Sequence, residues 1–223
     1  MKKIKKRIFL LSGKMGSGKN FTAEAITKRL IELNRTVTQT MFAGKLKQMA
    51  SEVFDPLAQY IKNEMDIVAR NCDKALTKDP HMIDFRDKLT LKKSQFFEEK
   101  SQLSRILLQT LGTDIVRTYV DDSFWIKATG DYIMSQQSSD YIITDWRYEN
   151  EFNELSLYLE QNSLSCKYEF ILVNVQRQIT RESSVKAKSH ESENALNHFD
   201  NFDVIVNNTE DSKHIIKILE SWL

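Results

Sequence analysis

Residues 8–19 read IFLLSGKMGSGK, in which four apolar residues and Ser12 lead into the pattern G-x-x-x-x-G-K. A short apolar run bounded by polar residues is typical of a buried parallel strand, and the residues after Lys19 have the periodicity of a helix. A strand, a glycine-rich loop and a helix in this order are the context that a phosphate-binding loop requires. Only six glycines occur in the 223 residues, and three of them lie in this loop. They mark backbone that has to bend in ways that other residues resist.

The loop pattern also predicts how a phosphate would be held. Glycines allow successive backbone N–H groups to point inward around a phosphate, and the helix that follows adds the positive end of its dipole. Lys19 is then placed to bridge the β- and γ-phosphates and to offset charge as a phosphoryl group moves. After this lysine the pattern expects Ser or Thr, whose hydroxyl binds Mg²⁺, whereas this chain has Asn20. An amide oxygen can hold the ion directly or through water, because Mg²⁺ keeps several waters.

Short apolar segments alternate with amphipathic ones along the chain, which predicts an α/β protein with a five-stranded parallel sheet. The expected strands are Ile8–Ser12, Thr36–Phe42, Tyr141–Thr144, Tyr168–Val175 and Val204–Val206. The expected crossover helices lie near Asn20–Leu33, Asn150–Gln161 and Asp211–Trp222. This order of strands and crossovers predicts a single domain over residues 1–223.

Two connections in this pattern are longer than a crossover requires. Residues 44–140 have helical periodicity with no convincing strand, so we expect a helical insertion between the second and third strands. The polar stretch 177–193 follows the fourth strand and carries Arg177 and Arg181. Long polar connections in compact domains are often lids, and lid arginines can neutralise charge on a transferred phosphoryl group. A solvated loop is the alternative for this stretch.

Composition and charge exclude other classes of protein. With 41% hydrophobic and 28% charged residues the chain has the composition of a soluble globular protein. Its longest run of aliphatic or aromatic residues is four, whereas a membrane span needs about 20. A net charge of +1 gives no general attraction to nucleic acid or to a membrane surface. Cys72 and Cys166 lie far apart, the four histidines lack metal-ligand spacing, and the basic start lacks the apolar core of a secretory signal. A cytoplasmic protein with reduced thiols is therefore expected.

Phosphate loops occur in switches, motors and kinases. A GTPase needs the pattern N/T-K-x-D after a strand, but the nearest string, TKDP at residues 77–80, has Pro at the last position and lies in the expected insertion. A motor or helicase would need a longer chain. The size, the helical insertion and the arginine-bearing stretch favour a small-molecule phosphotransferase in which a lid excludes water. The predicted ATP-binding residues are Gly13, Gly16, Ser17, Gly18, Lys19, Asn20 and Phe21.

Four further segments resemble the phage-type deoxynucleoside monophosphate kinases. They are SRILLQTLGTD at 104–114, FWIK at 124–127, TDWR at 144–147 and SHESENAL at 189–196. The similarity runs along nearly the whole chain in the same order and is weakest across 55–102. It implies the P-loop nucleoside monophosphate kinase fold, with a helical insertion that binds the acceptor. It also implies transfer of the ATP γ-phosphoryl group to a deoxynucleoside 5′-monophosphate, with Mg²⁺ as cofactor.

The resemblance further implies residues of the acceptor site. Arg105 and Gln109 stand four apart on an expected helix and share a face, from which Arg can bind a phosphate and Gln can read a base edge. Asp145 and Arg147 follow the end of an apolar strand, where open α/β sheets place ligands. There Asp145 would orient Mg²⁺-bound water and Arg147 would clamp a phosphate. The predicted acceptor-binding residues are Lys14, Arg105, Gln109, Gly112, Thr113, Trp125, Asp145, Arg147 and Glu151.

The phosphate loop, the end of the third strand and the lid stretch also provide candidate catalytic and metal-binding residues. The predicted catalytic residues are Lys19, Arg147, Arg177 and Arg181, and the predicted metal-binding residues are Asn20 and Asp145. The resembling family usually has Asp at the position of Asn20. It usually has a basic residue near Met15 and Gly16, which Lys14 would replace here. Trp125 stands between Phe124 and Ile126, so stacking on a base and burial in the core are both open.

Two other functions fit part of the sequence. The chain also resembles the animal-type phosphomevalonate kinases, in segments around the phosphate loop, in Asp145-x-Arg147 and in 191–203. The LGTD segment and Trp125 favour a nucleotide as acceptor. A regulatory module that binds ATP without turnover is the alternative from another class, and the intact Lys19 argues against it. ATP and a deoxynucleoside monophosphate are thus the expected partners, and a homodimer is compatible with the sequence.

Overall fold

The computed structural model describes residues 4–52, 102–177, 195–208 and 211–223. Five parallel strands form one sheet in the order β2–β3–β1–β4–β5. The strands are β1 (Ile4–Ser12), β2 (Val37–Thr40), β3 (Asp140–Ile143), β4 (Cys166–Gln176) and β5 (Val204–Asn207). This confirms the predicted α/β fold with a five-stranded parallel sheet.

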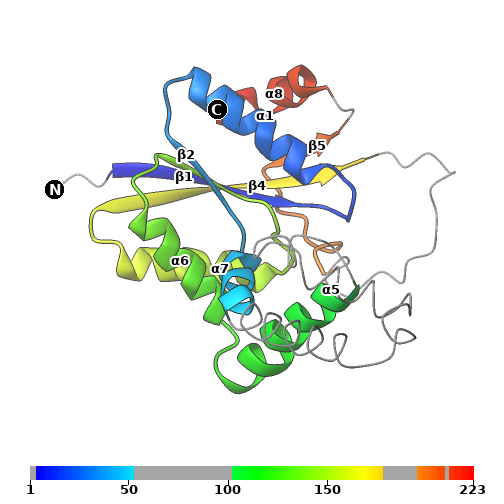
Figure 1. Cartoon of the computed structure of the whole chain (residues 1–223). Helices are drawn as coiled ribbons and strands as arrows, with labels where there is room; N and C mark the ends of the chain where they lie inside the picture. The colour runs from blue at the N-terminus through cyan, green and yellow to red at the C-terminus, as the bar shows by residue number, and fades with distance from the viewer. Residues whose placement is uncertain (1–3, 53–101, 178–194, 209–210) are drawn as a thin grey trace, which may run out of the picture. The chain divides into compact units, whose positions relative to one another are not determined.

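Two layers of helices bury the two faces of the sheet (Figure 1). Alternate residues of β1 pack against the two helix layers, because successive side chains of a strand point to opposite faces. Phe9 and Leu11 pack with α1 (Lys19–Glu32) and α8 (Ser212–Leu219), and α8 continues as a 3₁₀ turn over Glu220–Trp222. Ile8 and Leu10 pack with α6 (Phe124–Ser135) and α7 (Glu149–Asn162). Among the described helices, none is long and apolar enough to span a membrane.

The chain divides into two compact units. One is built from residues up to Ala43 and from Trp125 onward, and the other from Gly44–Phe124. The insertion predicted over 44–140 includes α6, which belongs to the first unit because Ile126 and Ile133 are fully buried against the sheet. A helix over residues 43–52 begins at Ala43, the last residue of this segment of the first unit, and otherwise belongs to the second unit. Also in the second unit, α5 (Gln102–Gln109) leads into a π-helix over Thr110–Arg117. Residues 53–101 of the predicted insertion lie outside the described residues.

A buried carboxylate joins three segments at the amino-terminal edge of the sheet. Asp140, fully buried at the start of β3, accepts hydrogen bonds from Arg7 Nε (2.6 Å), Arg35 Nη2 (3.0 Å) and Ser139 Oγ (2.8 Å), and Arg35 Nε also bonds to it. Burial alone would raise the pKa of this carboxyl, but the bonds from the two arginines and the serine outweigh it and hold the pKa below its ordinary value. The carboxylate therefore stays charged and ties β1, β3 and the turn before β2 together.

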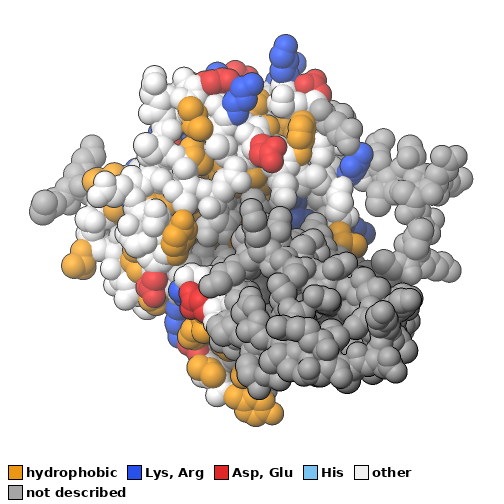
Figure 2. All heavy atoms as spheres, in the orientation of Figure 1, with side chains coloured by type: hydrophobic (Ala, Val, Ile, Leu, Met, Phe, Trp, Pro, Cys, Tyr) orange, Lys and Arg blue, Asp and Glu red, His pale blue; other side chains and the backbone are white. Residues whose placement is uncertain are grey.

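Charged side chains of both signs are interspersed on the face of the molecule shown in Figure 2. This mixing agrees with a formal net charge of +1 from 32 basic and 31 acidic residues.

Candidate active site

Three segments with predicted site residues in the first unit follow the carboxyl ends of three neighbouring strands. The loop 13–18 follows β1, the turn 144–148 follows β3, and Arg177 follows β4. Because β1 lies between β3 and β4 and all run parallel, these three segments leave the same edge of the sheet. Ligands in open α/β sheets bind at this edge.

Three glycines give the loop its shape. The φ angles are +142° at Gly13, +80° at Gly16 and +93° at Gly18, in the left-handed region that side chains with a Cβ rarely adopt. Ser17 N donates to Lys14 O at 3.1 Å, which closes a turn that contains Gly16 and lies between Gly13 and Gly18. The backbone is thus bent as a phosphate-binding loop requires.

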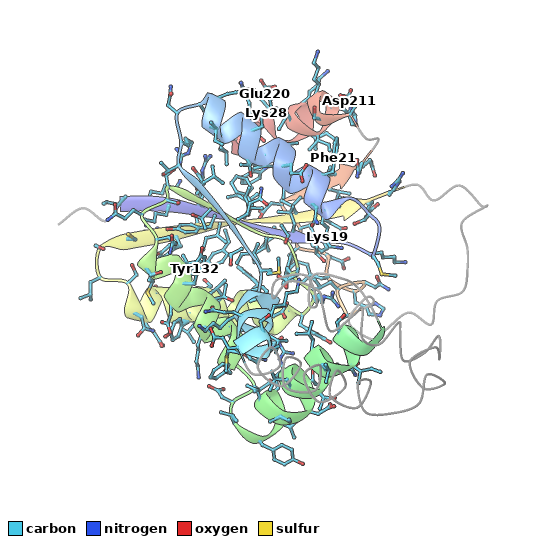
Figure 3. All side chains as sticks on the ribbon, in the orientation of Figure 1. Lys19, Phe21, Lys28, Tyr132, Asp211 and Glu220 are labelled. Carbon is cyan, nitrogen blue, oxygen red and sulfur yellow. The ribbon has the colours of Figure 1, made fainter. Side chains whose placement is uncertain are left out.

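Lys19 begins α1 and folds back over the loop. Its Nζ donates to Gly13 O at 2.5 Å and to Lys14 O at 3.0 Å, so the ammonium lies above the loop backbone. Figure 3 shows this residue at the start of α1, with Lys28 farther along the same helix. A phosphate bound in the loop would therefore meet a positive charge that already lies over the loop backbone.

The other predicted ATP-binding residues differ in burial. Ser17 is buried, and its Oγ has no hydrogen-bond partner within the described part of the chain. Asn20 is exposed on the first turn of α1. Lys14, which was predicted to bind the acceptor instead, is exposed in the loop. Phe21 packs against the core between α1, β1 and α8, so its side chain has a structural role. Contact of these residues with ATP stays a prediction.

The turn after β3 is held by contacts that the sequence did not indicate. Asp145 Oδ1 accepts from Phe42 N at 2.8 Å and Oδ2 from Ala43 N at 3.0 Å. These two amides lie at the start of the helix 43–52, where backbone N–H groups lack partners within the helix and a negative charge is favourable. Asp145 therefore ties the segment that follows β2 to the carboxyl end of β3. Its role toward Mg²⁺ stays a prediction.

Arg147 is held by its backbone. Glu151 is only 4% exposed, and its Oε2 accepts from Arg147 N at 2.8 Å and from Tyr148 N at 3.1 Å. Trp146, fully buried against Phe199 and Phe202, donates from Nε1 to Tyr148 O at 2.7 Å. The exposed side chain of Arg147 thus extends from a rigid turn. Glu151, predicted to bind the acceptor, contacts this turn.

We expect Glu151→Ala to lower kcat/KM between about ten- and a hundredfold, because small displacements of a positioning group are costly in catalysis. Glu151→Gln should recover part of the loss, since the amide oxygen can still accept from the Arg147 amide. Steady-state kinetics measures both. Glu160→Ala on the exposed face of α7 is the control. Equal activity of Glu151→Ala and the wild-type protein would show that the turn does not need this carboxylate.

The remaining predicted residues divide between the two units. Arg105 and Gln109 lie on α5, and Gly112 and Thr113 lie in the π-helix that follows, where Gln109 and Thr113 are exposed. Gly112 is buried, and a Cβ there would lie 2.6 Å from a methyl carbon of Leu46. π-Helical segments are frequent at functional sites.

Two predictions concern the first unit. Trp125 is only 4% exposed, which supports its role as a core residue. Arg177 is described and exposed immediately after β4. Arg181 and the rest of the predicted lid, residues 178–193, lie outside the described residues.

Among the described residues, no group of three or more His, Cys, Asp or Glu side chains gathers in a way that could hold a metal ion. A site that uses an amide oxygen, one carboxylate and waters is compatible with this, because Mg²⁺ in kinases is held by few protein ligands and by the substrate phosphates. Asn20 and Asp145 remain the predicted oxygen ligands of such a site.

Comparison with known proteins adds an independent observation. A sequence model of the deoxynucleotide monophosphate kinase family matches residues 44–218. The chain belongs to this family. No curated protein matches the sequence. The family match begins after the loop 13–18, so it does not depend on the phosphate loop. Together with the all-parallel sheet, family membership makes the chain an ATP-dependent phosphotransferase with a P-loop kinase fold, as the sequence predicted.

Proposed function

We propose that this kinase transfers the γ-phosphoryl group of ATP to a deoxynucleoside 5′-monophosphate, giving ADP and the deoxynucleoside diphosphate. The observation that carries the proposal is the loop after β1, with three glycines at positive φ and Lys19 folded over it, in a chain of the deoxynucleotide monophosphate kinase family. The loop accounts for the phosphate donor, and the family for the acceptor.

The chemistry follows from the charges at the carboxyl edge of the sheet. The acceptor phosphate is already an anion, so the reaction needs positioning and charge stabilisation more than a general base. In this proposal Lys19 binds the β- and γ-phosphates of ATP, and Arg147 binds the phosphate of the acceptor. Arg177 and Arg181 stabilise the charge on the transferred group.

Magnesium is part of the proposal because kinases use a divalent cation with ATP. When bound, Mg²⁺ neutralises charge on the phosphate oxygens. We propose that Asn20 and Asp145 hold the ion or its waters. Both oxygens of Asp145 accept backbone N–H groups, and a carboxylate oxygen retains a further lone pair for a water.

A coupled assay for ADP release tests the proposal directly. The purified chain is given ATP, Mg²⁺ and in turn dGMP, dTMP, dCMP, dAMP and phosphomevalonate. Release that depends on a deoxynucleoside monophosphate supports the proposal. Release only with phosphomevalonate, or binding of ATP without release under any condition, would contradict it.

We expect Arg105→Ala and Gln109→Ala to lower the affinity for the acceptor monophosphate about tenfold or more, and to leave the affinity for ATP nearly unchanged. The reason is that both residues lie on α5 in the unit Gly44–Phe124, whereas the phosphate loop belongs to the other unit. Loss of a hydrogen bond to a charged group accounts for this magnitude. Calorimetric titration of each ligand gives the two affinities.

A glutamine on the other described helix of this unit provides the control. Gln48 is exposed on the helix 43–52 and bonds to Glu52, so Gln48→Ala should change neither affinity. Equal weakening of ATP and of the acceptor in the Gln109 variant would show that the acceptor residues have been assigned wrongly.

A further inference from the structure

Asn208 makes two contacts that join the end of the sheet to the phosphate loop. It directly follows β5 and is 6% exposed. Its backbone N–H donates to Gln176 O at 2.8 Å, next to the last β4–β5 pair. Its side-chain Nδ2 donates to Ser17 O at 2.9 Å, in a buried bond between residues 191 positions apart. The side chain is therefore anchored on the sheet and bonded to the loop.

Gly18 is shaped to receive this side chain. A Cβ at Gly18 would lie 1.7 Å from Asn208 Nδ2 and 2.9 Å from its Cγ, so the amide occupies the space of a residue-18 side chain. A similar fit occurs at the other end of the loop, where a Cβ at Gly13 would lie 2.2 Å from Val175 O. The loop thus packs closely at both ends against residues from the ends of β4 and β5, and Asn208 also bonds to it.

The bond to Ser17 O also fixes the direction of a peptide plane. In a trans peptide the C=O and the following N–H point in opposite directions. Because Ser17 O points at the Asn208 amide, the N–H of Gly18 points away from it. Backbone N–H groups of such loops are the ones that turn toward a bound phosphate.

We propose that Asn208 is a positioning residue for the phosphate loop: its side-chain amide orients the peptide between Ser17 and Gly18 for binding of the ATP phosphates. The inference rests on the proposed function of the loop. Without the amide, Ser17 O loses its buried partner, and the glycine-rich segment regains alternative conformations. Both effects reduce the fraction of the protein in which the loop is ready to bind.

Two variants separate the effect of the amide as a hydrogen-bond donor from the effect of the side-chain volume. Asn208→Ala removes the whole amide, whereas Asn208→Leu keeps a branched side chain of similar size without a donor. Asn162→Ala is the matched control, because Asn162 Nδ2 also donates to a backbone oxygen, Tyr158 O at 2.8 Å, but at an exposed site on α7. Circular dichroism of the full-length variants checks that each is folded.

Calorimetry then measures the dissociation constants of ATP and of inorganic tripolyphosphate, which has no base. We expect both Asn208 variants to raise the dissociation constants of both ligands by a similar factor of about ten or more. This is the factor for one lost buried hydrogen bond. The KM for ATP should rise with kcat much less affected, because the loop binds the phosphates in the ground state and the transition state alike. Asn162→Ala should match the wild-type protein.

Three results would overturn the inference. Unchanged affinities in folded Asn208 variants would reduce Asn208 to a residue of general stability. Weakening of ATP alone, with tripolyphosphate unaffected, would mean that the side chain acts on the base. A wild-type protein that binds neither ATP nor tripolyphosphate would refute the proposed function itself, and the inference with it.

Discussion

Lys19→Ala is expected to lower kcat at least about 10²-fold and to leave the fold intact, the usual scale for losing one charge-stabilising donor. The ammonium lies over the loop backbone, within 2.5 Å of Gly13 O and 3.0 Å of Lys14 O, where it would meet the transferred phosphoryl group. Because these acceptors are loop carbonyls, alanine removes no partner from the hydrophobic core. Single-turnover kinetics at saturating ATP and acceptor measures the chemical step.

The control for this variant lies on the same helix. Lys28 is exposed on α1 (Figure 3), so Lys28→Ala changes the net charge equally without touching the loop. A normal kcat in Lys19→Ala, with Lys28→Ala also normal, would show that phosphoryl transfer does not take place at this loop.

Asp140→Asn is expected to lower the free energy of unfolding by about 3 to 5 kcal/mol, the range for removing one partner of a buried ion pair. The substitution keeps the size of the side chain but leaves two guanidinium groups, those of Arg7 and Arg35, without their buried counter-charge. Chemical denaturation at pH 7 measures the loss. Asp131→Asn is the control, because its carboxylate accepts only a surface bond from the Tyr158 hydroxyl among the interactions described, and should cost less than about 1 kcal/mol.

The loss of stability in Asp140→Asn is expected to depend on pH. The arginines hold the pKa of Asp140 below its ordinary value of 3.8, so the folded state binds this proton less readily than the unfolded state does. The contribution to stability is therefore fully present above about pH 5 and falls as the pH drops through 4 toward the folded-state pKa. The difference between wild type and Asp140→Asn should shrink over that interval. A difference that stays constant down to pH 2 would contradict the assignment.

The sequence predicted the sheet because its strands carry their signal locally. Ile8–Leu11 and Tyr141–Ile143 are apolar runs between polar residues, and each of the five strands overlaps one of the segments predicted to be a strand. The beginning of β1 was missed, since Lys5, Lys6 and Arg7 look like a solvated segment. In the structure they pair in register with residues 167–169 of β4, and Lys6 and Arg7 also bond to residues near β3.

Site residues, too, could be predicted where the signal is local in the sequence. The phosphate loop and Arg147 were predicted because each depends on a short pattern at the end of one strand. The contacts of Asn208 with Ser17 and of Asp145 with Phe42 join residues 191 and 103 positions apart, and no local spacing encodes such pairs. Glu151 was found through a family resemblance, yet its contacts with the backbone of Arg147 required coordinates.

The place of β1 at the centre of a parallel sheet has a consequence for the time at which the kinase becomes functional during synthesis. Arg7 and its partner Asp140 are 133 residues apart, which a ribosome needs roughly 7 to 27 s to cover at about 5 to 20 residues per second. Throughout that interval the apolar residues of β1 have neither neighbouring strand, and such non-local pairing is intrinsically slow. The phosphate loop remains without its neighbours for longer still, because Val175 and Asn208, which pack against its two ends, are synthesised after Asp140. The loop that we propose binds ATP is thus synthesised well before the residues that pack against its two ends.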